Sequence, residues 1–337
     1  MAGYQGFNNK LAISTSCLGL HPCHDLAEKL LAAASHGFQG IEIVYGDLER
    51  YSDGRKISLT AGAEQIRTIC RDAGLEILSL CPLENFEGTK TPIADRLEVA
   101  KHWIEIARIL QAPYVQCPAQ YGKDVIGDEV LIVSELQQLA DLGSAAEPVV
   151  AIAYEPMSWS THYSTWQAAV RLAELVDREN FRICMDTFHI ASLIYGSPHS
   201  VDGLRPNGPQ NLADDLHSFV SSFPTERLAY VQLSDGERWD TPFSKEHSWY
   251  VDGWDPEMCW SGSGRPFPVE TDFGGYFPVA EMVRKWIVEK GFKGWVSMET
   301  FDRRMRDEAY EIEDAAKRAE ASIQRLKKAV VQEQSLL

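Results

Sequence analysis

The chain has 337 residues, of which 45% are hydrophobic and 24% are charged, and its formal net charge is −17 at pH 7. This composition is typical of a globular protein with a sizeable core. The acidic balance argues against a nucleic-acid partner, because binding to phosphates needs a basic surface that releases counterions. It argues equally against an anionic membrane surface, so the sequence predicts neither partner.

The start of the chain, MAGYQGFNNKLAIS, lacks the basic residues and apolar core of a secretory signal. No apolar run reaches the length of about 18 residues that suggests a membrane span. The seven cysteines form no CxxC pair, and Cys81, Cys117 and Cys184 lie in apolar runs, where a free thiol behaves as a small hydrophobe. These features predict a reduced, cytoplasmic protein.

Short runs of β-forming residues alternate with longer runs of helical periodicity. The expected strands cover residues 11–19, 41–45, 76–81, 114–119, 149–156, 181–186, 228–235 and 294–300. Helical patterns are clearest at 26–37, 63–74, 96–112 and 279–291, and the first two close on Gly37 and Gly74, as helices commonly do. Such alternation indicates parallel βαβ units with right-handed crossovers.

Two architectures fit this alternation, a closed (β/α)8 barrel and an open doubly wound sheet. The open sheet usually carries GxGxxG after its first strand, and TSCLGLHPC lacks it. We therefore predict one α/β domain over residues 1–337, a TIM barrel. A segment rich in Trp, Pro, Gly and Ser at 236–275 is predicted as a long active-site loop. The first few residues and the tail at 328–337 are predicted to be disordered.

Four consecutive strands carry a polar residue at or near their carboxyl end: Glu155, Asp186, Gln232 and Glu299. In a TIM barrel these ends form one mouth, where the chemistry lies. Three carboxylates crowded into a partly buried site need a cation, and oxygen ligands favour Mg²⁺ or Mn²⁺ over Zn²⁺. A single acid at a strand end is more often a helix N-cap, but four such ends in succession favour a metal site.

Two further residues are placed to act at this mouth. His189 follows Asp186 by three residues and can serve as a general base or substrate donor, although a lone His is more often structural. Arg238 follows Gln232 by six residues and is either a ligand for an anionic or hydroxylated molecule or a surface arginine. Other aromatic residues are interpreted as structural. We expect Tyr154, Trp159 and Trp166 in the core or the pocket wall, and His36 at a helix end.

With these residues, the chain resembles the sugar-phosphate isomerase/epimerase (xylose isomerase-like) TIM barrels. In that superfamily, a His three residues after the Asp ligand and an Arg six residues after the strand-7 ligand commonly contact the substrate, and MDTFH and QLSDGER show both spacings. Finer motifs, among them NFEG, RICMDTFHIA, VQLSDGER and CWSGSGRPFP, resemble the 3-dehydroshikimate dehydratases, particularly those of fungal quinate catabolism. The resemblance runs from about residue 10 to about residue 325.

The resemblance implies a hydro-lyase that removes water from 3-dehydroshikimate and yields protocatechuate. It implies one divalent metal ion, Mn²⁺ or Mg²⁺, held by Glu155, Asp186, Gln232 and Glu299, with Gln232 at the position where epimerases usually have His. It also implies catalytic roles for His189 and Arg238. Ser261 and Arg265, in the long loop, are implied to bind the substrate carboxylate.

The chain departs from the family pattern where substrate would lie. Departures occur at Cys81, Ala119, Gln120, Pro156 and Gly262. A second hypothesis is therefore a metal-dependent epimerase or isomerase of a ketose or inositol, with a second carboxylate base near Glu155. A third is a non-catalytic binding protein, against which the intact ligand set argues, and a related endonuclease would need more His ligands and a basic face. The expected partner is a small carboxylated molecule. A homo-oligomer is compatible with the sequence, which gives no oligomeric state.

Overall fold

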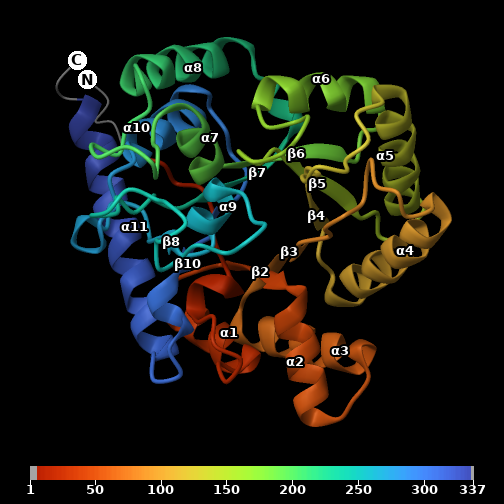
Figure 1. Cartoon of the computed structure of the whole chain (residues 1–337). Coiled ribbons are helices and arrows are strands. Elements are labelled where there is room, and N and C mark those ends of the chain that lie inside the picture. The colour runs from red at the N-terminus through yellow and green to blue at the C-terminus, as the bar shows by residue number, and fades with distance from the viewer. Residues whose placement is uncertain (1–5, 335–337) are drawn as a thin grey trace.

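Eight parallel strands close into a barrel, as a computed structural model of residues 6–334 shows (Figure 1). Their order around the barrel is β1-β2-β3-β4-β5-β6-β7-β9. The strands are β1 Leu11–Ser14, β2 Gly40–Val44, β3 Glu76–Cys81, β4 Tyr114–Pro118, β5 Ala151–Glu155, β6 Phe181–Asp186, β7 Leu228–Leu233 and β9 Val296–Met298. Each strand overlaps one of the eight predicted runs. The predicted closed barrel is confirmed.

Most of the helices form an outer layer around these strands, and the short helix α9 (Pro256–Ser261) lies over the barrel instead (Figure 1). The described α-helices are α1 Leu26–Ser35, α2 Tyr45–Arg55, α3 Leu59–Ala73, α4 Ile93–Leu110, α5 Glu129–Ser144, α6 Trp166–Val176, α7 Thr187–Ile194, α8 Gly208–Ser222, α9 Pro256–Ser261, α10 Val279–Val283 and α11 Ile312–Gln334. A π-helix at Arg284–Glu289 continues α10, and short 3-10 turns occupy Thr15–Leu18, Thr225–Arg227, Thr271–Phe273 and Arg303–Arg306.

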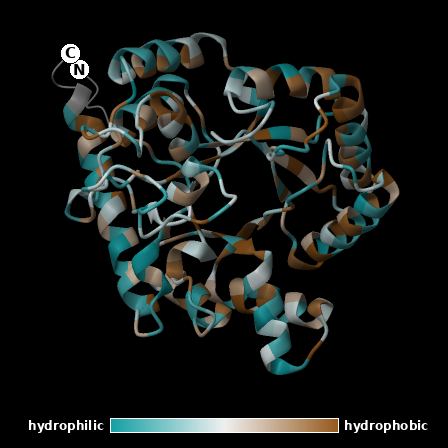
Figure 2. Ribbon diagram, viewed as in Figure 1, coloured by the Kyte–Doolittle hydropathy of each residue, from teal (hydrophilic) through white to brown (hydrophobic). Residues whose placement is uncertain are grey.

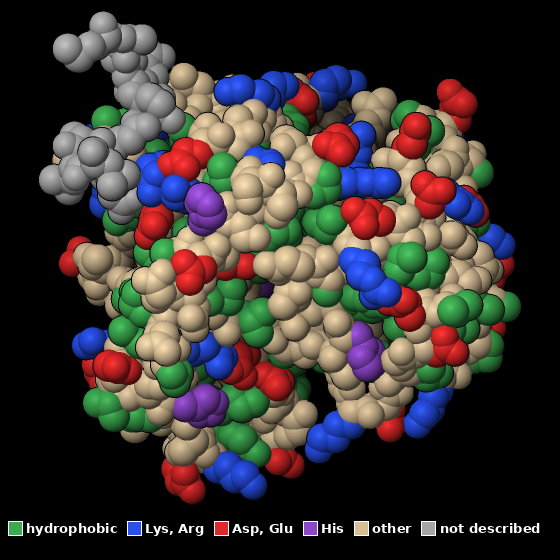
Figure 3. Space-filling view, turned by 90° about the horizontal axis from the view of Figure 1, so that it is seen from above, with side chains coloured by type: hydrophobic (Ala, Val, Ile, Leu, Met, Phe, Trp, Pro, Cys, Tyr) green, Lys and Arg blue, Asp and Glu red, His purple; other side chains and the backbone are tan. Residues whose placement is uncertain are grey.

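Helix α3 shows how the sequence produces this layer. Ser58 caps its start by accepting a hydrogen bond from the Ala61 amide, at 3.1 Å. Ile66 and Cys70, four residues apart, are buried on one side of the helix, as an apolar stripe requires. Gly74 ends it with a φ of 75°, a left-handed conformation that glycine adopts at low cost. The same division holds across the molecule: hydrophobic residues concentrate on strands and inner helix faces, whereas acidic and basic side chains are interspersed on the surface (Figures 2 and 3).

The predicted loop at 236–275 contains regular structure. It includes α9 and β8 (Gly264–Arg265), which pairs antiparallel with β10 (Phe301–Asp302). Asp235 connects the two ends of this segment. Its Oδ1 accepts hydrogen bonds from the amides of Gly236, Tyr276 and Phe277 at 2.9, 2.9 and 2.7 Å. Its Oδ2 accepts a fourth from the Val269 amide at 3.0 Å. One buried carboxylate thus holds together chain positions more than 40 residues apart.

The predicted disorder of the tail is wrong for residues 328–334, which continue helix α11. Val330 is buried, and so are Leu326 and Ile323, at the spacing of one helix face. The apolar stripe therefore packs this part of the tail onto the barrel. Residues 335–337 and the predicted disordered residues 1–5 lie outside the described part of the chain.

All seven cysteines are free thiols, and six are buried. Between residues 6 and 334, we find no helix whose length and apolar character would let it cross a membrane.

Candidate active site

The four polar strand-end residues meet at the carboxyl end of the barrel. Glu155 and Asp186 are the last residues of β5 and β6, Gln232 is the penultimate residue of β7, and Glu299 follows β9 directly. All four are buried. Gln232 Nε2 donates to Glu299 Oε1 at 3.2 Å, and an arginine links Glu299 to Asp186. The shared mouth follows from the parallel strands, whose carboxyl ends all point the same way.

One carboxylate oxygen of Glu155 accepts a hydrogen bond, and the other has no hydrogen-bond partner. Its Oε2 accepts a hydrogen bond from Gln116 Nε2 at 2.7 Å. Its Oε1 is buried without a hydrogen-bond partner, and it lies 3.5 Å from His189 Nε2. A buried carboxylate oxygen without a donor is costly unless a ligand satisfies it.

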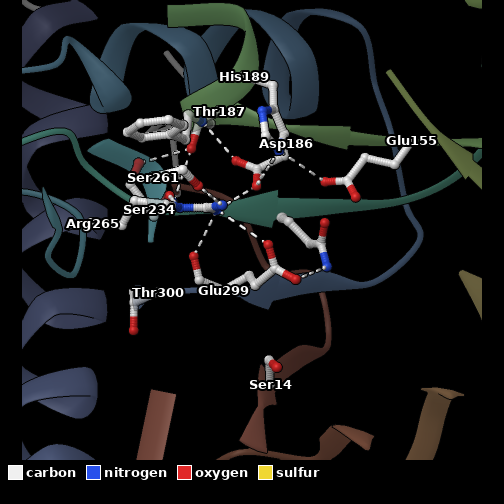
Figure 4. A network of polar contacts seen from close by, with 12 residues as sticks. Ser14, Glu155, Asp186, Thr187, His189, Ser234, Ser261, Arg265, Glu299 and Thr300 are labelled. Atoms are coloured by element: carbon white, nitrogen blue, oxygen red, sulfur yellow. Dashed lines mark hydrogen bonds and ion pairs between the residues drawn. The ribbon is translucent and has the colours of Figure 1, made fainter. Parts of the chain in front are cut away.

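Asp186 combines the two roles that the sequence offered as alternatives. Its Oδ1 accepts a hydrogen bond from the Phe188 amide at 2.6 Å and so caps α7. Its Oδ2 faces the mouth, where it contacts Arg265 and lies 3.9 Å from His189 Nε2. The cap orients the carboxylate, so that the second oxygen points into the site and pairs there with Arg265 (Figure 4).

His189 lies in the first turn of α7 and is fully enclosed. Its Nδ1 accepts a hydrogen bond from the Ser158 amide, and its Nε2 faces the carboxylates. The Trp159 ring and the imidazole pack in a T-shaped arrangement, with 4.7 Å between ring centroids. Burial, reinforced by the charge of Arg265, lowers the pKa of His189 well below its usual value, so the ring is neutral at physiological pH.

Arg265 reaches the site through the β8–β10 ribbon. The ribbon pairs Arg265 with Phe301, two residues after Glu299, which explains why the guanidinium lies next to that carboxylate. Arg265 Nη2 contacts Asp186 Oδ2 and lies 3.2 Å from Glu299 Oε2. Its Nε donates to Ser234 Oγ at 3.0 Å, and its Nη1 to Ser261 Oγ at 3.4 Å. Nη1 is therefore the nitrogen with the weakest protein contact (Figure 4).

The carboxylates destabilise one another electrostatically. Burial and the charges of Glu299 and Asp186 raise the pKa of Glu155 well above its usual value. Burial also raises the pKa of Glu299 to about 8, although Arg265 opposes this shift. Arg265 offsets only one of the three carboxylate charges, so the site favours a further cation.

Glu155, Asp186 and His189 each offer an atom within 4.8 Å of the other two, close enough for one metal ion. Carboxylate oxygens suit this role. The imidazole can bind an ion only if Nε2 gives up its proton, because Nδ1 already accepts a hydrogen bond from the Ser158 amide.

Four polar residues at the site were not identified from the sequence. They are Glu42, Ser79, Gln116 and Ser234. Glu42 accepts hydrogen bonds from Gln232 Nε2 at 3.1 and 3.2 Å and from Ser79 Oγ at 2.8 Å. A charged residue between two isoleucines in GIEIV was a signal that could have pointed to Glu42.

Arg238 is not brought to this cluster. Its side chain is exposed and packs beside Gly203, and none of the contacts described within residues 6–334 joins it to the strand-end carboxylates. The physical reason is that its neighbours Glu237 and Trp239 point inward and are buried.

A cavity of about 1050 Å³ opens beside the site. Its lining includes Trp159, whose ring also contacts His189, whereas the imidazole and the strand-end carboxylates themselves do not line it. Among the other lining residues are Glu84, Tyr121, Tyr250, Trp254 and Asp255. Four of the positions that depart from the family pattern are buried at strand ends on this half of the barrel: Cys81, Ala119, Gln120 and Pro156. Gly262 ends α9 next to Ser261.

Comparisons with known proteins agree with this architecture. The profile of the family described as "Xylose isomerase-like TIM barrel" matches residues 30–329. The chain is 37% identical over 320 residues to a 3-dehydroshikimate dehydratase of Neurospora crassa, covering 90% of this chain and 89% of that protein. It is 30% identical over 278 residues to a 3-dehydroshikimate dehydratase of Pseudomonas aeruginosa, where the match spans 82% of this chain but 36% of that protein.

Among solved structures, a xylose isomerase-like TIM barrel/4-hydroxyphenylpyruvate dioxygenase fusion protein superimposes with a TM-score of 0.74 at 24% identity. The match covers 96% of this chain and 43% of that one, and it supports the fold alone. The family profile and the Neurospora crassa relative both extend over most of the chain. The chain therefore belongs to the xylose isomerase-like TIM-barrel family, in the branch of the 3-dehydroshikimate dehydratases.

Proposed function

We propose that the protein is a metal-dependent 3-dehydroshikimate dehydratase that converts 3-dehydroshikimate to protocatechuate. The observation that carries the proposal is the buried group of Glu155, Asp186 and His189 at the barrel mouth, in a chain 37% identical to a dehydratase of that name. The reaction breaks a C–H bond α to a ketone and the C–O bond of the β-hydroxyl, forms a C=C bond and releases water. Aromatisation of the ring follows.

The residues present fit a divalent cation. Glu155 Oε1 is buried without a hydrogen-bond partner, and the three carboxylates have one guanidinium among them. Glu155, Asp186 and Glu299 would hold the ion through oxygen, and Gln232 through its carbonyl oxygen. Such a donor set suits Mn²⁺ or Mg²⁺. A cation bound there would act as a Lewis acid that stabilises negative charge on the ketone oxygen of the substrate.

His189 is the proposed proton-transfer group. With Nδ1 occupied by the Ser158 amide, the neutral ring carries its proton on Nε2, the nitrogen that faces the site. In this tautomer the Nε2–H group can donate a hydrogen bond to the departing hydroxyl. To take up the α-proton, Nε2 must first be free of its own proton, with the proton on Nδ1 in place of the Ser158 contact. The α-proton taken up by Nε2 then passes to the hydroxyl, which leaves as water. General acid–base catalysis of this kind contributes ~10²- to 10⁴-fold in rate.

Ser261 and Arg265 are proposed to bind the substrate carboxylate. Arg265 Nη1 and Ser261 Oγ lie 3.4 Å apart, and together they offer two donors on the same side of the site. A fork of two parallel hydrogen bonds from Arg265 alone would require it to leave Ser234 or the carboxylates. A catalytic role for Arg238 stays a prediction from the family spacing.

The decisive experiment is an assay of the purified protein with 3-dehydroshikimate and Mn²⁺ or Mg²⁺, followed by the ultraviolet absorbance of the catechol acid product. Chromatography against authentic protocatechuate identifies the product. If the protein does not turn over 3-dehydroshikimate but epimerises a ketose or inositol, the result would support the alternative epimerase or isomerase function.

A further inference from the structure

Glu42 is a fully buried carboxylate that the proposed chemistry does not use. It lies in the middle of β2 between Ile41 and Ile43, and its exposed fraction is 0%. A carboxylate inside a barrel is costly unless donors satisfy it. The donors here are the Ser79 hydroxyl and the amide of Gln232, one of the four proposed metal ligands.

The contact between Glu42 and Gln232 crosses the interior of the barrel. Strands β2 and β7 are not neighbours, because β1 and β9 lie between them in the closed sheet. Glu42 and Gln232 are 190 residues apart in sequence, so no local turn brings them together. Gln232 is in register with Asp186 on β6, which places this contact directly beside the proposed ligands.

The direction of the hydrogen bonds constrains the amide of Gln232. A carboxylate only accepts, and an amide donates only through its nitrogen. Gln232 Nε2 lies 3.1 and 3.2 Å from the two oxygens of Glu42 and 3.2 Å from Glu299 Oε1, so acceptors on both side chains hold the nitrogen away from the position of the carbonyl oxygen. Among the described contacts, the carbonyl oxygen of Gln232 accepts a hydrogen bond only from the Cys184 thiol, at 3.2 Å. A thiol is a weak donor that would not compete with a cation.

We propose that Glu42 is a positioning residue for the metal site, which fixes the amide of Gln232 so that its carbonyl oxygen remains free for the cation. The inference rests on the proposed function, in which Gln232 is a ligand. With a neutral amide at position 42, either end of the Gln232 amide could face it. Only Glu299 Oε1 would then favour the present orientation, and the position of the carbonyl oxygen would be less strictly defined.

The test compares Mn²⁺ affinity in the wild-type protein, E42Q, Q232E and the double variant E42Q/Q232E. Free Mn²⁺ is measured by electron paramagnetic resonance, which needs no substrate. We expect E42Q to weaken binding by about 10- to 100-fold, the usual effect of losing a residue that orients a ligand. Q232E places a second carboxylate beside that of Glu42, and the two repel each other. In the double variant the amide is at position 42 and the carboxylate at position 232, so a hydrogen bond between them can form again. The double variant should therefore bind Mn²⁺ more tightly than the product of the two single effects predicts.

A matched control is E135Q. Glu135 is also buried, but it pairs with Arg96 outside the barrel mouth. This variant should melt at a lower temperature and keep the wild-type Mn²⁺ affinity, which separates lost stability from lost positioning. E42D, which keeps the charge but withdraws it from Gln232, serves if E42Q does not fold, and it should also bind Mn²⁺ more weakly.

Wild-type Mn²⁺ affinity in folded E42Q, or additive losses in the double variant, would overturn the role of Glu42. A wild-type protein that binds no Mn²⁺ would refute both this inference and the proposed metal dependence. A wild-type protein that binds Mn²⁺ but does not turn over 3-dehydroshikimate would refute only the proposed substrate, and the affinity comparison would still decide the role of Glu42.

Discussion

The backbone amide of Ser158 donates a hydrogen bond to Nδ1 of His189, with 3.3 Å between the two nitrogens. Because Nδ1 accepts this bond, the neutral imidazole carries its proton on Nε2. That nitrogen lies 3.5 Å from Glu155 Oε1 and 3.9 Å from Asp186 Oδ2, in the place where a ligand or substrate would meet the carboxylates. The loop after β5 thus selects the tautomer of a residue on α7, and it favours Nε2 as a hydrogen-bond donor over Nε2 as a metal ligand.

This relationship predicts the effect of removing the imidazole. His189→Ala should lower kcat by ~10²- to 10⁴-fold, the usual contribution of a general acid or base. The Mn²⁺ content of the protein should stay near that of the wild type, since Nε2 is protonated and cannot bind an ion. Metal analysis and steady-state kinetics on the same preparation check both points. Loss of Mn²⁺ in proportion to activity would instead make His189 a ligand, and ¹⁵N NMR of the ring would then show a proton on Nδ1.

Chelation is the second test of the site. Excess chelator should abolish dehydration, and added Mn²⁺ or Mg²⁺ should restore it, because the carboxylates at the mouth need a cation. Glu299→Gln should raise the Mn²⁺ concentration needed for half-maximal activity, and Tm should change little because Asp186 remains the ion-pair partner of Arg265. Full activity in chelator, with no metal found in the protein, would remove the basis for the metal site.

The third prediction concerns Arg265. Arg265→Ala should lower kcat/KM by about one to two powers of ten, because charge-assisted hydrogen bonds contribute roughly 1.5–3 kcal/mol. It should also lower Tm, since the guanidinium is the buried partner of Asp186 and Glu299, and breaking such a pair costs about 3–5 kcal/mol. Mn²⁺ should recover part of the lost stability. Arg265→Lys should keep the charge but lose the contacts to Ser234 and Ser261, and so should remain impaired.

Arg238→Ala is the comparison that gives this result its meaning. Arg238 is exposed and outside the carboxylate cluster, so its removal should lower kcat/KM much less than Arg265→Ala and leave Tm unchanged. An equal loss of activity in both variants would show that Arg238 reaches the substrate, as the family spacing predicts. Unchanged turnover in Arg265→Ala would weaken the dehydratase relative to an epimerase, whose neutral substrate has no carboxylate to bind.

The fourth prediction is a pH dependence of stability far from the mouth. His36 caps the end of α1, and its two ring nitrogens lie 2.7 Å from Glu320 and 3.0 Å from Glu313, both on α11. Burial lowers the pKa of His36, but the hydrogen bonds to Glu320 and Glu313 outweigh it and raise the pKa above the usual value. The folded state therefore prefers the imidazolium. Its contribution to the free energy of unfolding is complete below about pH 6.5 and is lost as the pH rises through the folded-state pKa.

His36→Ala should accordingly lower Tm at about pH 5.5 more than at about pH 8.5. Melting curves at the two pH values measure the difference. His217→Ala, which removes an exposed histidine from α8, is the matched control for the loss of a histidine side chain. An equal loss of Tm at both pH values would mean that His36 stabilises the helix end through packing alone.

Much of the fold follows from local sequence patterns. Runs such as FRICMD and EILSLC can bury both faces only in a parallel sheet covered by helices, and the amphipathic segments between them supply that cover. Once the strands are parallel, their carboxyl ends share one side. The convergence of Glu155, Asp186 and Glu299 could therefore be predicted without knowing any contact. The prediction of a disordered tail is wrong for residues 328–334 because Val330 continues the buried face that Ile323 and Leu326 form on α11.

The remaining contacts depend on the closed barrel and on the path of the segment after β7. The sequence by itself determined the eight strands, their alternation with helices, and the identity of the strand-end acids, because these are properties of neighbouring residues. Only the tertiary structure decided that Arg265 sits against Asp186, 79 residues away, and that Glu42 meets Gln232 across the barrel. The reason is physical: periodicity reports which face of a strand is buried, whereas the inward side chains that touch are set by the stagger and closure of the whole sheet.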